Sequence, residues 1–169
     1  EAINVKWICD ANAGLLKYAE LVISYEDDKN YSGGIVLKKV VNYPTGEWSL
    51  NSLVQIETDT GLVPTTLGPA FVAFNKTLVS YDLPKTIRKI GAAAFFFCTK
   101  VVNPPNFPAE LDSIGAAAFY YNQSANGALI IPPRIKVIEK DTFGWCANLK
   151  SIAFAEGSQL ERIEARAFR

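Results

Sequence analysis

The chain has 169 residues, of which 49% are hydrophobic, and its 17 basic residues balance its 17 acidic ones. This length suits one domain or two small ones, with enough apolar side chains for a sizeable core. A neutral chain without a basic run disfavours nucleic acid and anionic membranes as partners, because phosphate neutralisation supplies most of such affinity. With no histidine and only three cysteines, the sequence excludes Ser-His-Asp and Cys-His catalysis, His-containing zinc or iron sites and an all-cysteine zinc site.

The start, EAINVKWICDANAG, lacks the basic-then-apolar layout of a signal peptide, and no apolar run reaches the length of about 18 residues that a membrane span needs. The sequence also contains no methionine. We therefore interpret the chain as a mature or trimmed segment of a longer protein, without membrane insertion in this segment.

Residues 1–60 are predicted to form a β-rich N-terminal domain or cap. Four segments rich in Val, Ile, Tyr and Trp indicate strands, namely INVKWIC (3–9), ELVISYE (20–26), GIVLKKVVNY (34–43) and EWSLNSLVQIETD (47–59). DDKNYSGG (27–34) is typical of a turn, whereas ANAGLLKYAEL (11–21) could be a short helix instead. Leu53 and Ile56 are spaced like Leu149 and Ile152, so diverged repeats remain an alternative for this region.

The acidic cluster in this region is a weak metal candidate. Glu26, Asp27, Asp28 and Asp59 lack the glycine-containing loop spacing that makes several oxygens converge on calcium. We expect no metal, no cofactor and no catalytic residues, because no motif marks a pair of carboxylates for glycoside hydrolysis either.

From residue 61 onward, one short phrase recurs about every 24 residues. It reads IGAAAFFFC, then IGAAAFYYN, then IEKDTFGWC, and the chain ends within a fourth copy. Each copy aligns an isoleucine, a phenylalanine and a cysteine or asparagine in one register. The aligned residues are Ile90, Ile114, Ile138 and Ile163; Phe95, Phe119, Phe143 and Phe168; and Cys98, Asn122 and Cys146.

A unit of this size cannot bury its own apolar face, so the copies must stack on one another. This predicts a right-handed solenoid at residues 61–169 with short parallel strands in each coil. We expect strands at the Leu/Ile-x-x-Ile pairs and at VVNP (101–104), ALIIP (128–132) and LKSIAF (149–154), while GAAAF makes one helical or 3₁₀ turn. Prolines between these pieces mark where the coil turns.

The Cys/Asn column is predicted to hydrogen-bond loop amides inside the coil. A disulfide between Cys98 and Cys146 is disfavoured, because the two residues lie two coils apart. Strands stacked at roughly 4.8 Å per coil place them about 10 Å apart, beyond the Cα separation of about 7 Å that a disulfide tolerates. We therefore expect free, buried thiols, and Cys9 has no evident partner.

These residues resemble the BspA-like leucine-rich repeat, whose phrase is P-x-x-I-x-x-I-G-x-x-A-F-x-x-C-x-x-L-x-x-I. The resemblance rests on LPKTIRKIGAAAFFFCTKV, FPAELDSIGAAAFYYNQS and PPRIKVIEKDTFGWCANLKSI and covers residues 84–169. It implies a leucine-rich repeat solenoid, mostly β with short helical or 3₁₀ turns, preceded by the small β-rich region. It also implies a secreted or cell-surface bacterial protein that adheres to host proteins or to other cells.

The chain departs from the family phrase in three places. Phe71 stands one period before Phe95, but the isoleucine columns fall on Val63 and Thr66, so we expect a degenerate capping coil there. Asn122 replaces cysteine, and NQSANGAL adds about four residues as a bulging loop. Because the chain stops within a repeat, we expect further coils in the native protein.

Two surfaces are candidates for partner binding. Stacked coils would align Phe97, Tyr121 and Trp145 as an aromatic ladder, which either packs between coils or, where exposed, holds a protein or a sugar. The concave face would expose Lys150, Ser151 and Ala153, with Ile130 and Val102 as counterparts, and would support weak or multivalent binding.

The charges of the Ile-x-x-Ile segments are predicted to form a solvated column of surface ion pairs. They are Arg88, Lys89, Asp112, Lys136, Glu161 and Arg162. The sequence thus favours a non-catalytic recognition or adhesion module that binds host or neighbouring-cell proteins or glycans. A structural spacer within a larger surface protein is the alternative, and the oligomeric state is left open.

Overall fold

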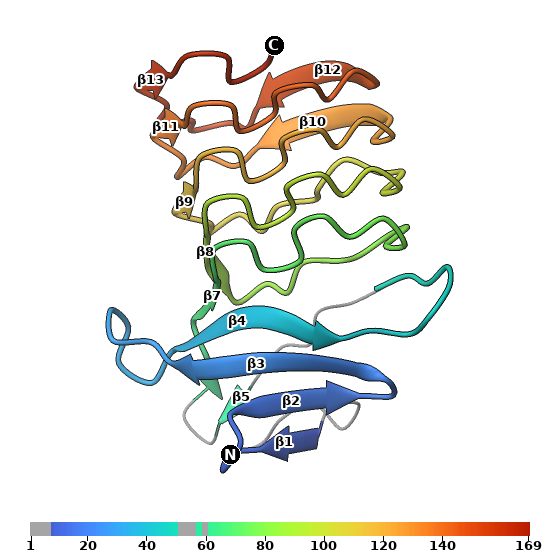
Figure 1. Cartoon of the computed structure of the whole chain (residues 1–169). Coiled ribbons are helices and arrows are strands. Elements are labelled where there is room, and N and C mark those ends of the chain that lie inside the picture. The colour runs from blue at the N-terminus through green and yellow to red at the C-terminus, as the bar shows by residue number, and fades with distance from the viewer. Residues whose placement is uncertain (1–7, 51–56, 59–60) are drawn as a thin grey trace.

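The computed structural model describes residues 8–50, 57–58 and 61–169, and short coils stack along one axis above an N-terminal sheet (Figure 1). We number the coils by residue: coil 1 is 63–86, coil 2 is 87–110, coil 3 is 111–134, coil 4 is 135–159, and 160–169 begins a fifth. The predicted solenoid is confirmed, and the described residues contain no helix.

The N-terminal region is an antiparallel meander of four strands, β1 (Ile8–Asp10), β2 (Leu15–Tyr18), β3 (Leu21–Asp27) and β4 (Ile35–Asn42). Strands predicted at 20–26 and 34–43 correspond to β3 and β4, and the turn at 27–34 connects them. β1 overlaps the end of the strand predicted at 3–9, whose residues 3–7 lie outside the described ranges. Of the strand predicted at 47–59, residues 51–56 and 59 lie outside those ranges, and residues 47–50 contain only an isolated bridge at Trp48. The helix considered for 11–21 is wrong. Gly14 and Ala19 have positive φ, which breaks a helix and instead closes a tight hairpin in which Tyr18 pairs with Leu21.

The meander and the coils share one sheet. β4 pairs in parallel with β7 (Thr65–Leu67) of coil 1, β7 with β8 (Ile87–Ile90), and β8 with β9 (Ser113–Ile114). The resulting order is β1-β2-β3-β4-β7-β8-β9. The domain boundary that we place after residue 60 stays a prediction, because residues 59 and 60 lie outside the described ranges, as do Leu53 and Ile56 of the alternative repeat reading.

Later coils continue the stack through two further parallel pairs. β11 (Val137–Ile138) pairs with β13 (Arg162–Ile163), and β10 (Gly127–Ile131) pairs with β12 (Leu149–Phe154) on another side of the coil (Figure 1). A small antiparallel pair joins β5 (Glu57–Thr58) to β6 (Gly61–Leu62). The strand predicted at 101–104 is absent, because Pro104 and Pro105 have no N–H to donate and only Val102 bonds to the coils on both sides.

A row of phenylalanine rings runs through the centre of the coils. Phe95 stacks on Phe119 with centroids 5.2 Å apart, and the next two steps, to Phe143 and Phe168, are 5.5 Å each. Interplanar angles of 6–7° show that the rings are nearly parallel. Ile90, Ile114 and Ile138 are buried beside this row, whereas Ile163 in the last coil is exposed.

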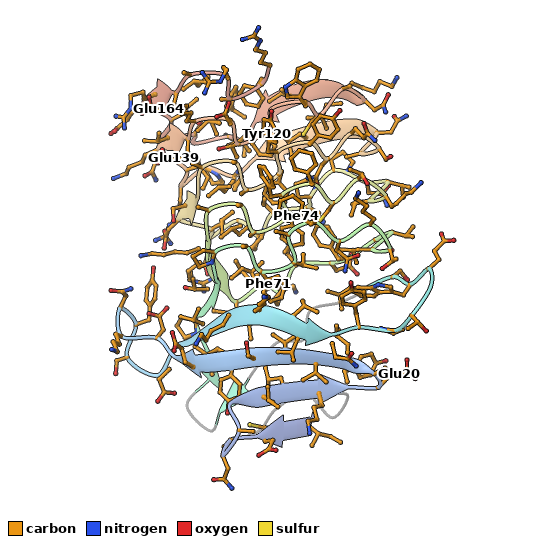
Figure 2. All side chains as sticks on the ribbon, in the orientation of Figure 1. Glu20, Phe71, Phe74, Tyr120, Glu139 and Glu164 are labelled. Atoms are coloured by element: carbon orange, nitrogen blue, oxygen red, sulfur yellow. The ribbon has the colours of Figure 1, made fainter. Side chains whose placement is uncertain are left out.

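Coil 1 carries the same architecture with its columns displaced. The structure pairs Thr65 with Ile87 and Leu67 with Ile90, so the predicted column positions Val63 and Thr66 are wrong. A register shift between Thr65 and Thr66 accounts for the difference. Phe71 is buried and meets Phe95 edge-on at 6.3 Å, so coil 1 continues the aromatic core (Figure 2).

The GAAAF stretch makes a chain of tight turns in place of the expected helical turn. In coil 2, the N–H groups of Ala94, Phe96 and Cys98 each bond the carbonyl three residues earlier. Helical continuation is interrupted because Ala93 and Phe97 have left-handed backbone angles, φ 56° and 57°. Every fourth residue therefore turns the chain, and each coil is closed without a helix.

The glycine of the phrase permits close stacking of successive coils. A Cβ atom on Gly115 would lie 2.4 Å from the backbone nitrogen of Ala92, and one on Gly91 would lie 2.6 Å from that of Pro69. Neither backbone can move away without breaking the stack. The requirement for glycine here comes from contact between coils rather than from an unusual φ.

Candidate functional site

The predicted aromatic ladder is present on the surface and contains one more ring than expected. Phe74 of coil 1 stacks on Phe97 (5.5 Å between centroids, 22°), Phe97 on Tyr121 (4.8 Å, 6°), and Tyr121 meets Trp145 (6.0 Å, 31°). The two end rings are the most open, since Phe74 is 63% and Trp145 is 54% exposed, while Phe97 and Tyr121 are half-buried. We call these four residues the ladder.

Sequence reasoning missed Phe74 because the columns of coil 1 are displaced. Counting back 24 residues from Phe97 gives Ala73, but the structural partner of Phe97 lies one position later. The signal was present in the aromatic pair Phe71 and Phe74, although only the backbone register between Leu67 and Ile90 shows which residue aligns with which.

All four ladder residues have left-handed backbone conformations, with φ between 55° and 62°. Bulky side chains are rare in this region, which costs an ordinary L-residue roughly 1–2 kcal/mol and costs glycine almost nothing. A turn that needed only its backbone shape would be served better by glycine. Ala93, Ala117 and Asp141 share this conformation, so it belongs to the turns of every coil, and at the ladder stacking between coils offsets its cost.

A second, inner row widens the aromatic surface. Phe96 stacks on Tyr120 at 5.2 Å, and Phe74 meets Phe96 edge-on at 5.3 Å. The row ends at Gly144, where a Cβ atom would lie 2.9 Å from the Tyr120 ring. Phe74 and Tyr120 thus lie on the same side of the stack in different coils (Figure 2).

The backbone N–H groups of the four ladder residues already have hydrogen-bond partners. Phe74 N bonds Phe96 O, Phe97 N bonds Tyr120 O, Tyr121 N bonds Gly144 O and Trp145 N bonds Arg169 O. These N–H groups run from coil to coil and are unavailable to a ligand. Recognition at the ladder therefore cannot use these backbone N–H donors and must rely mainly on side chains.

The side chains of the Cys/Asn column point into the coils, and each one contacts a backbone carbonyl of the preceding coil. Asn122 Nδ2 donates to Phe95 O at 2.8 Å, while Cys146 Sγ lies 3.2 Å from Phe119 O and Cys98 Sγ lies 3.4 Å from Val72 O. Both cysteines are free thiols, as predicted, but only Cys98 is fully buried and Cys146 is half-buried. Burial raises the pKa of the Cys98 thiol to about 12 and that of the Cys146 thiol to about 11, which makes both unreactive at neutral pH.

The concave-face candidates are exposed but chemically plain. Lys150 and Ser151 lie on β12 and point to solvent, and in the neighbouring coils Ile130 and Val102 are also exposed. A shallow pocket of about 320 Å³ opens beside Ile130, lined mostly by prolines and alanines of coils 2–4. Lys150 and Ser151 are not part of it, so the concave candidates do not converge on one site.

Arg88 and Asp112 of the predicted charge column form ion pairs, but with residues outside that column. Arg88 pairs with Glu110 at 2.9 Å, and Arg134 with Asp112 at 2.8 Å. Asp112 also accepts a hydrogen bond from Tyr31 Oη, and Lys89 Nζ lies 5.4 Å from the centre of the Tyr31 ring. The turn at 27–34 thus contacts coils 2 and 3 as well as linking two strands.

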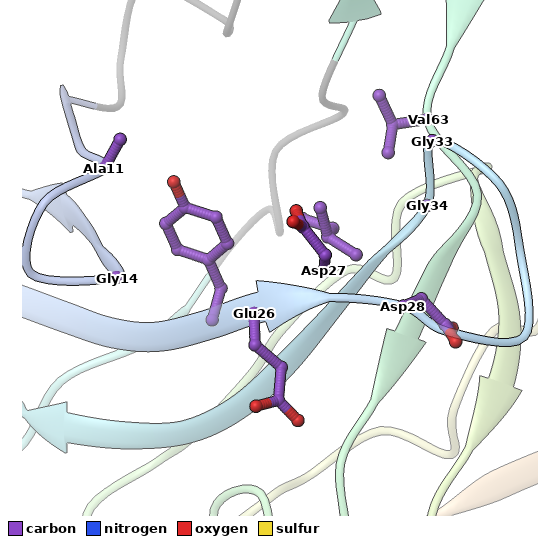
Figure 3. Close-up of a pocket in the computed structure, with 10 residues that line it drawn as sticks. Ala11, Gly14, Glu26, Asp27, Asp28, Gly33, Gly34 and Val63 are labelled. Atoms are coloured by element: carbon purple, nitrogen blue, oxygen red, sulfur yellow. The ribbon is translucent and has the colours of Figure 1, made fainter.

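Three members of the acidic cluster do not converge (Figure 3), and the fourth, Asp59, lies outside the described residues. A pocket of about 740 Å³ lies beside it, but the carboxylates of Glu26, Asp27 and Asp28 point in three different directions (Figure 3). Glu26 pairs with Lys38 at 3.5 Å, and buried Asp28 accepts hydrogen bonds from Thr66 Oγ1 and the N–H of Asn30. Within the described ranges, no group of three His, Cys, Asp or Glu side chains is placed to hold a metal.

No helix capable of crossing a membrane is found in the described part of the chain. In the described residues, a partner is offered the ladder and the exposed residues around Ile130 and Lys150. Of these, only the ladder is a continuous structure that spans four coils.

Comparison with known proteins agrees with this architecture. The family model for the BspA type leucine rich repeat region matches residues 69–169 in six copies. A crystal structure of a leucine rich cell surface protein from Faecalibacterium prausnitzii A2-165 aligns over 91% of this chain and 45% of its own length, with a TM-score of 0.61 and 18% identity. This chain thus spans less than half the length of that protein.

A leucine rich repeat protein of T. pallidum aligns over 82% of this chain and 88% of its own, with a TM-score of 0.49 and 17% identity. No curated protein matches the sequence significantly. At these identities the likeness concerns the fold.

Proposed function

Because this chain belongs to the BspA type leucine-rich repeat family, we propose that it is a non-catalytic recognition module of a secreted or cell-surface bacterial protein. The proposed binding surface is the ladder, and the proposed partners are proteins of a host or of neighbouring cells. The leucine rich cell surface protein with the same fold supports the location at a surface.

The observation that carries this proposal is the continuous surface stack of four aromatic side chains from four successive coils, whose two end rings are more than half exposed. Contiguous exposed apolar surface marks interaction sites, whereas single exposed apolar residues need no explanation. Aromatic side chains with polar tips, such as those of Tyr120 and Tyr121, are also the residues that anchor protein interfaces.

A protein partner fits the ladder better than a sugar does. Sugars stack on an exposed ring face, whereas Phe97 and Tyr121 have their faces covered by neighbouring rings in the stack. Phe97 and Tyr121, the two middle rings of the ladder, therefore offer a partner only their ring edges and the Tyr121 hydroxyl. Glycans are therefore the second class of partner in the test.

The test is binding of the whole chain to arrays of extracellular-matrix proteins and glycans, beside the variants Trp145→Ala and Tyr121→Gly. Glycine at position 121 removes the ring and also relieves the left-handed backbone, so the fold is expected to survive, as circular dichroism would verify. Tyr18→Ala, an exposed aromatic residue on β2 of the meander, is the matched control.

Binding of the native chain and of Tyr18→Ala, but not of the two ladder variants, is the expected result. Binding that both ladder variants retain would move recognition to another face, with Lys150 and Ser151 on the concave side next in order. Absence of binding to any protein or glycan would favour the alternative, in which these coils are a structural spacer within a longer surface protein.

A further inference from the structure

We propose that the ladder docks the apolar ridge of an amphipathic α-helix of a protein partner, with acidic residues beside that ridge. This inference rests on the proposed function and specifies the shape and charge of the partner. It follows from the spacing of the rings, the state of the backbone beneath them and the charges around them.

The spacing of the rings matches a helix. Successive centroids lie 5.5, 4.8 and 6.0 Å apart from Phe74 to Trp145, and an α-helix repeats one face about every 5.4 Å. Side chains at i, i+3 or i+4, i+7 and i+11 of a helix lying along the ladder would therefore meet the four rings in turn. An extended strand repeats one face about every 6.6–6.8 Å and falls out of step within two rings.

The backbone excludes the other common mode of peptide recognition. Strand addition requires free N–H and C=O groups at an edge, but the N–H groups of all four ladder residues are bonded to the next coil. A partner gains nothing from an extended conformation here. Its affinity must come from apolar side chains set at the ring spacing, which is what a helix face provides.

The charges around the ladder are complementary to an acidic flank. In the turns that carry it, at 70–77, 93–100, 116–124 and 140–148, the basic residues are Lys76, Lys100 and Lys140, and the single acidic residue is Asp141. Asp141 is held by Arg166 through two contacts of 2.9 and 3.2 Å, and this hydrogen bonding lowers the pKa of its carboxyl.

Lys76 and Lys100 are exposed and make no ion pair with a described residue. They follow Phe74 and Phe97 by two and three residues, and so lie beside the same end of the ladder. The acids Glu139 and Glu164 lie by β11 and β13, to the side of Phe74 and Tyr120 (Figure 2). A helix on the ladder would therefore meet lysines near Phe74 and Phe97.

The test is selection from a displayed library of helix-forming peptides of about 18 residues, or five turns, with Ala, Leu, Glu and Lys allowed at every position. The full chain is the bait, and a second selection uses the Phe97→Gly/Tyr121→Gly double variant. Enriched peptides are then measured by fluorescence anisotropy against both chains and against Lys76→Glu/Lys100→Glu. Circular dichroism establishes that each variant is folded.

The expected peptides carry leucine at i, i+3 or i+4, i+7 and i+11, with glutamate beside this stripe. Their affinity should fall at least about tenfold in the glycine double variant and in the charge-reversed variant, and lysine in place of the peptide glutamates should restore binding to the latter. Peptides that alternate leucine at every second position, peptides that bind the glycine variant equally, or no enrichment over that variant would each overturn the inference.

This outcome is separable from failure of the proposed function. If the arrayed proteins bind in a ladder-dependent manner but helical peptides are not enriched, the ladder recognises another shape and only the present inference is wrong. If both experiments fail, the proposed recognition function falls as well.

Discussion

The side-chain amide of Asn122 donates a hydrogen bond to the backbone carbonyl of Phe95, 2.8 Å away in the preceding coil. Cys146 makes the equivalent contact from the next coil, with its sulfur 3.2 Å from Phe119 O. Asparagine and cysteine thus perform the same task at this position, because either can place one donor between two coils. The departure of residue 122 from the family phrase preserves its physical role.

Asn122→Ala should lower the free energy of unfolding by about 0.5–1.5 kcal/mol, since the Phe95 carbonyl loses one of its two donors and keeps only the Cys98 N–H, 3.3 Å away. Asn122→Cys should recover much of this loss. Urea denaturation of the three chains at pH 7 measures the difference. Equal stability of the alanine and cysteine variants would show that the column fills space and that its hydrogen bonds contribute little.

Gly115→Ala and Ala117→Gly should change stability in opposite directions. A methyl group on Gly115 would lie 2.4 Å from the Ala92 backbone, an overpacking that costs about 1–3 kcal/mol or more. Ala117 has φ 56°, so glycine there removes left-handed strain and is expected to be neutral or slightly stabilising. Thermal unfolding of the two variants, two residues apart, checks both signs together.

Phe119→Ala should be one of the most damaging single changes in the repeats. Its ring is buried between Phe95 and Phe143, and loss of such a side chain costs about 3–5 kcal/mol. Phe168→Ala is the matched control, because that ring is only half-buried and has a single partner in the row. A comparable loss from both variants would contradict the view that stacking on two sides matters.

The buried thiols should make stability fall in alkaline solution. The unfolded thiols titrate near 9.0, whereas Cys98 and Cys146 titrate at about 12 and about 11 in the folded chain. Below pH 9 both states hold the protons, so the contribution is fully present. It is lost as pH rises from 9 toward 12, because only the unfolded state releases protons there.

Urea titrations at pH 8 and pH 10.5 measure this fall, and Cys98→Ala/Cys146→Ala should show a smaller one. Burial also raises the pKa of Tyr81 well above its usual range, so part of the fall should persist in the cysteine variant. At pH 8, iodoacetamide should modify Cys98 and Cys146 only in the presence of denaturant. Rapid alkylation of the native chain would show that the coils open more readily than their packing indicates.

The sequence was sufficient to predict the position of a side chain that has the same neighbour in every coil. Phe95, Phe119 and Phe143 repeat because each lies between its own copies, so period and burial go together. The same reasoning predicted the inward cysteines and the surface row of Phe97, Tyr121 and Trp145. It failed at Phe74, since a register shift between Thr65 and Thr66 displaces coil 1, and the aromatic pair Phe71 and Phe74 alone does not show which ring aligns with Phe97.

Other failures have similar causes. Leu15–Tyr18 forms a strand because left-handed angles at Gly14 and Ala19 set a hairpin, and residue type alone does not reveal the angle at an alanine. The charge pairs were mispredicted because Arg88 and Asp112 find partners outside the predicted column, Glu110 and Arg134, each 22 residues later and so nearly one coil further along. Neither the repeat period nor residue type shows which face binds a partner, because exposed residues are not constrained by the repeat.

The turn at 27–34 has a consequence for how the molecule comes apart. In most solenoids each coil contacts only its neighbours, so unfolding can spread one coil at a time from either end. Here Asp28 is bonded to Thr66 of coil 1, and Tyr31 contacts Lys89 of coil 2 and Asp112 of coil 3. Amide exchange should therefore be slow and uniform from β3 to coil 3, and should quicken along the chain only beyond the reach of Tyr31.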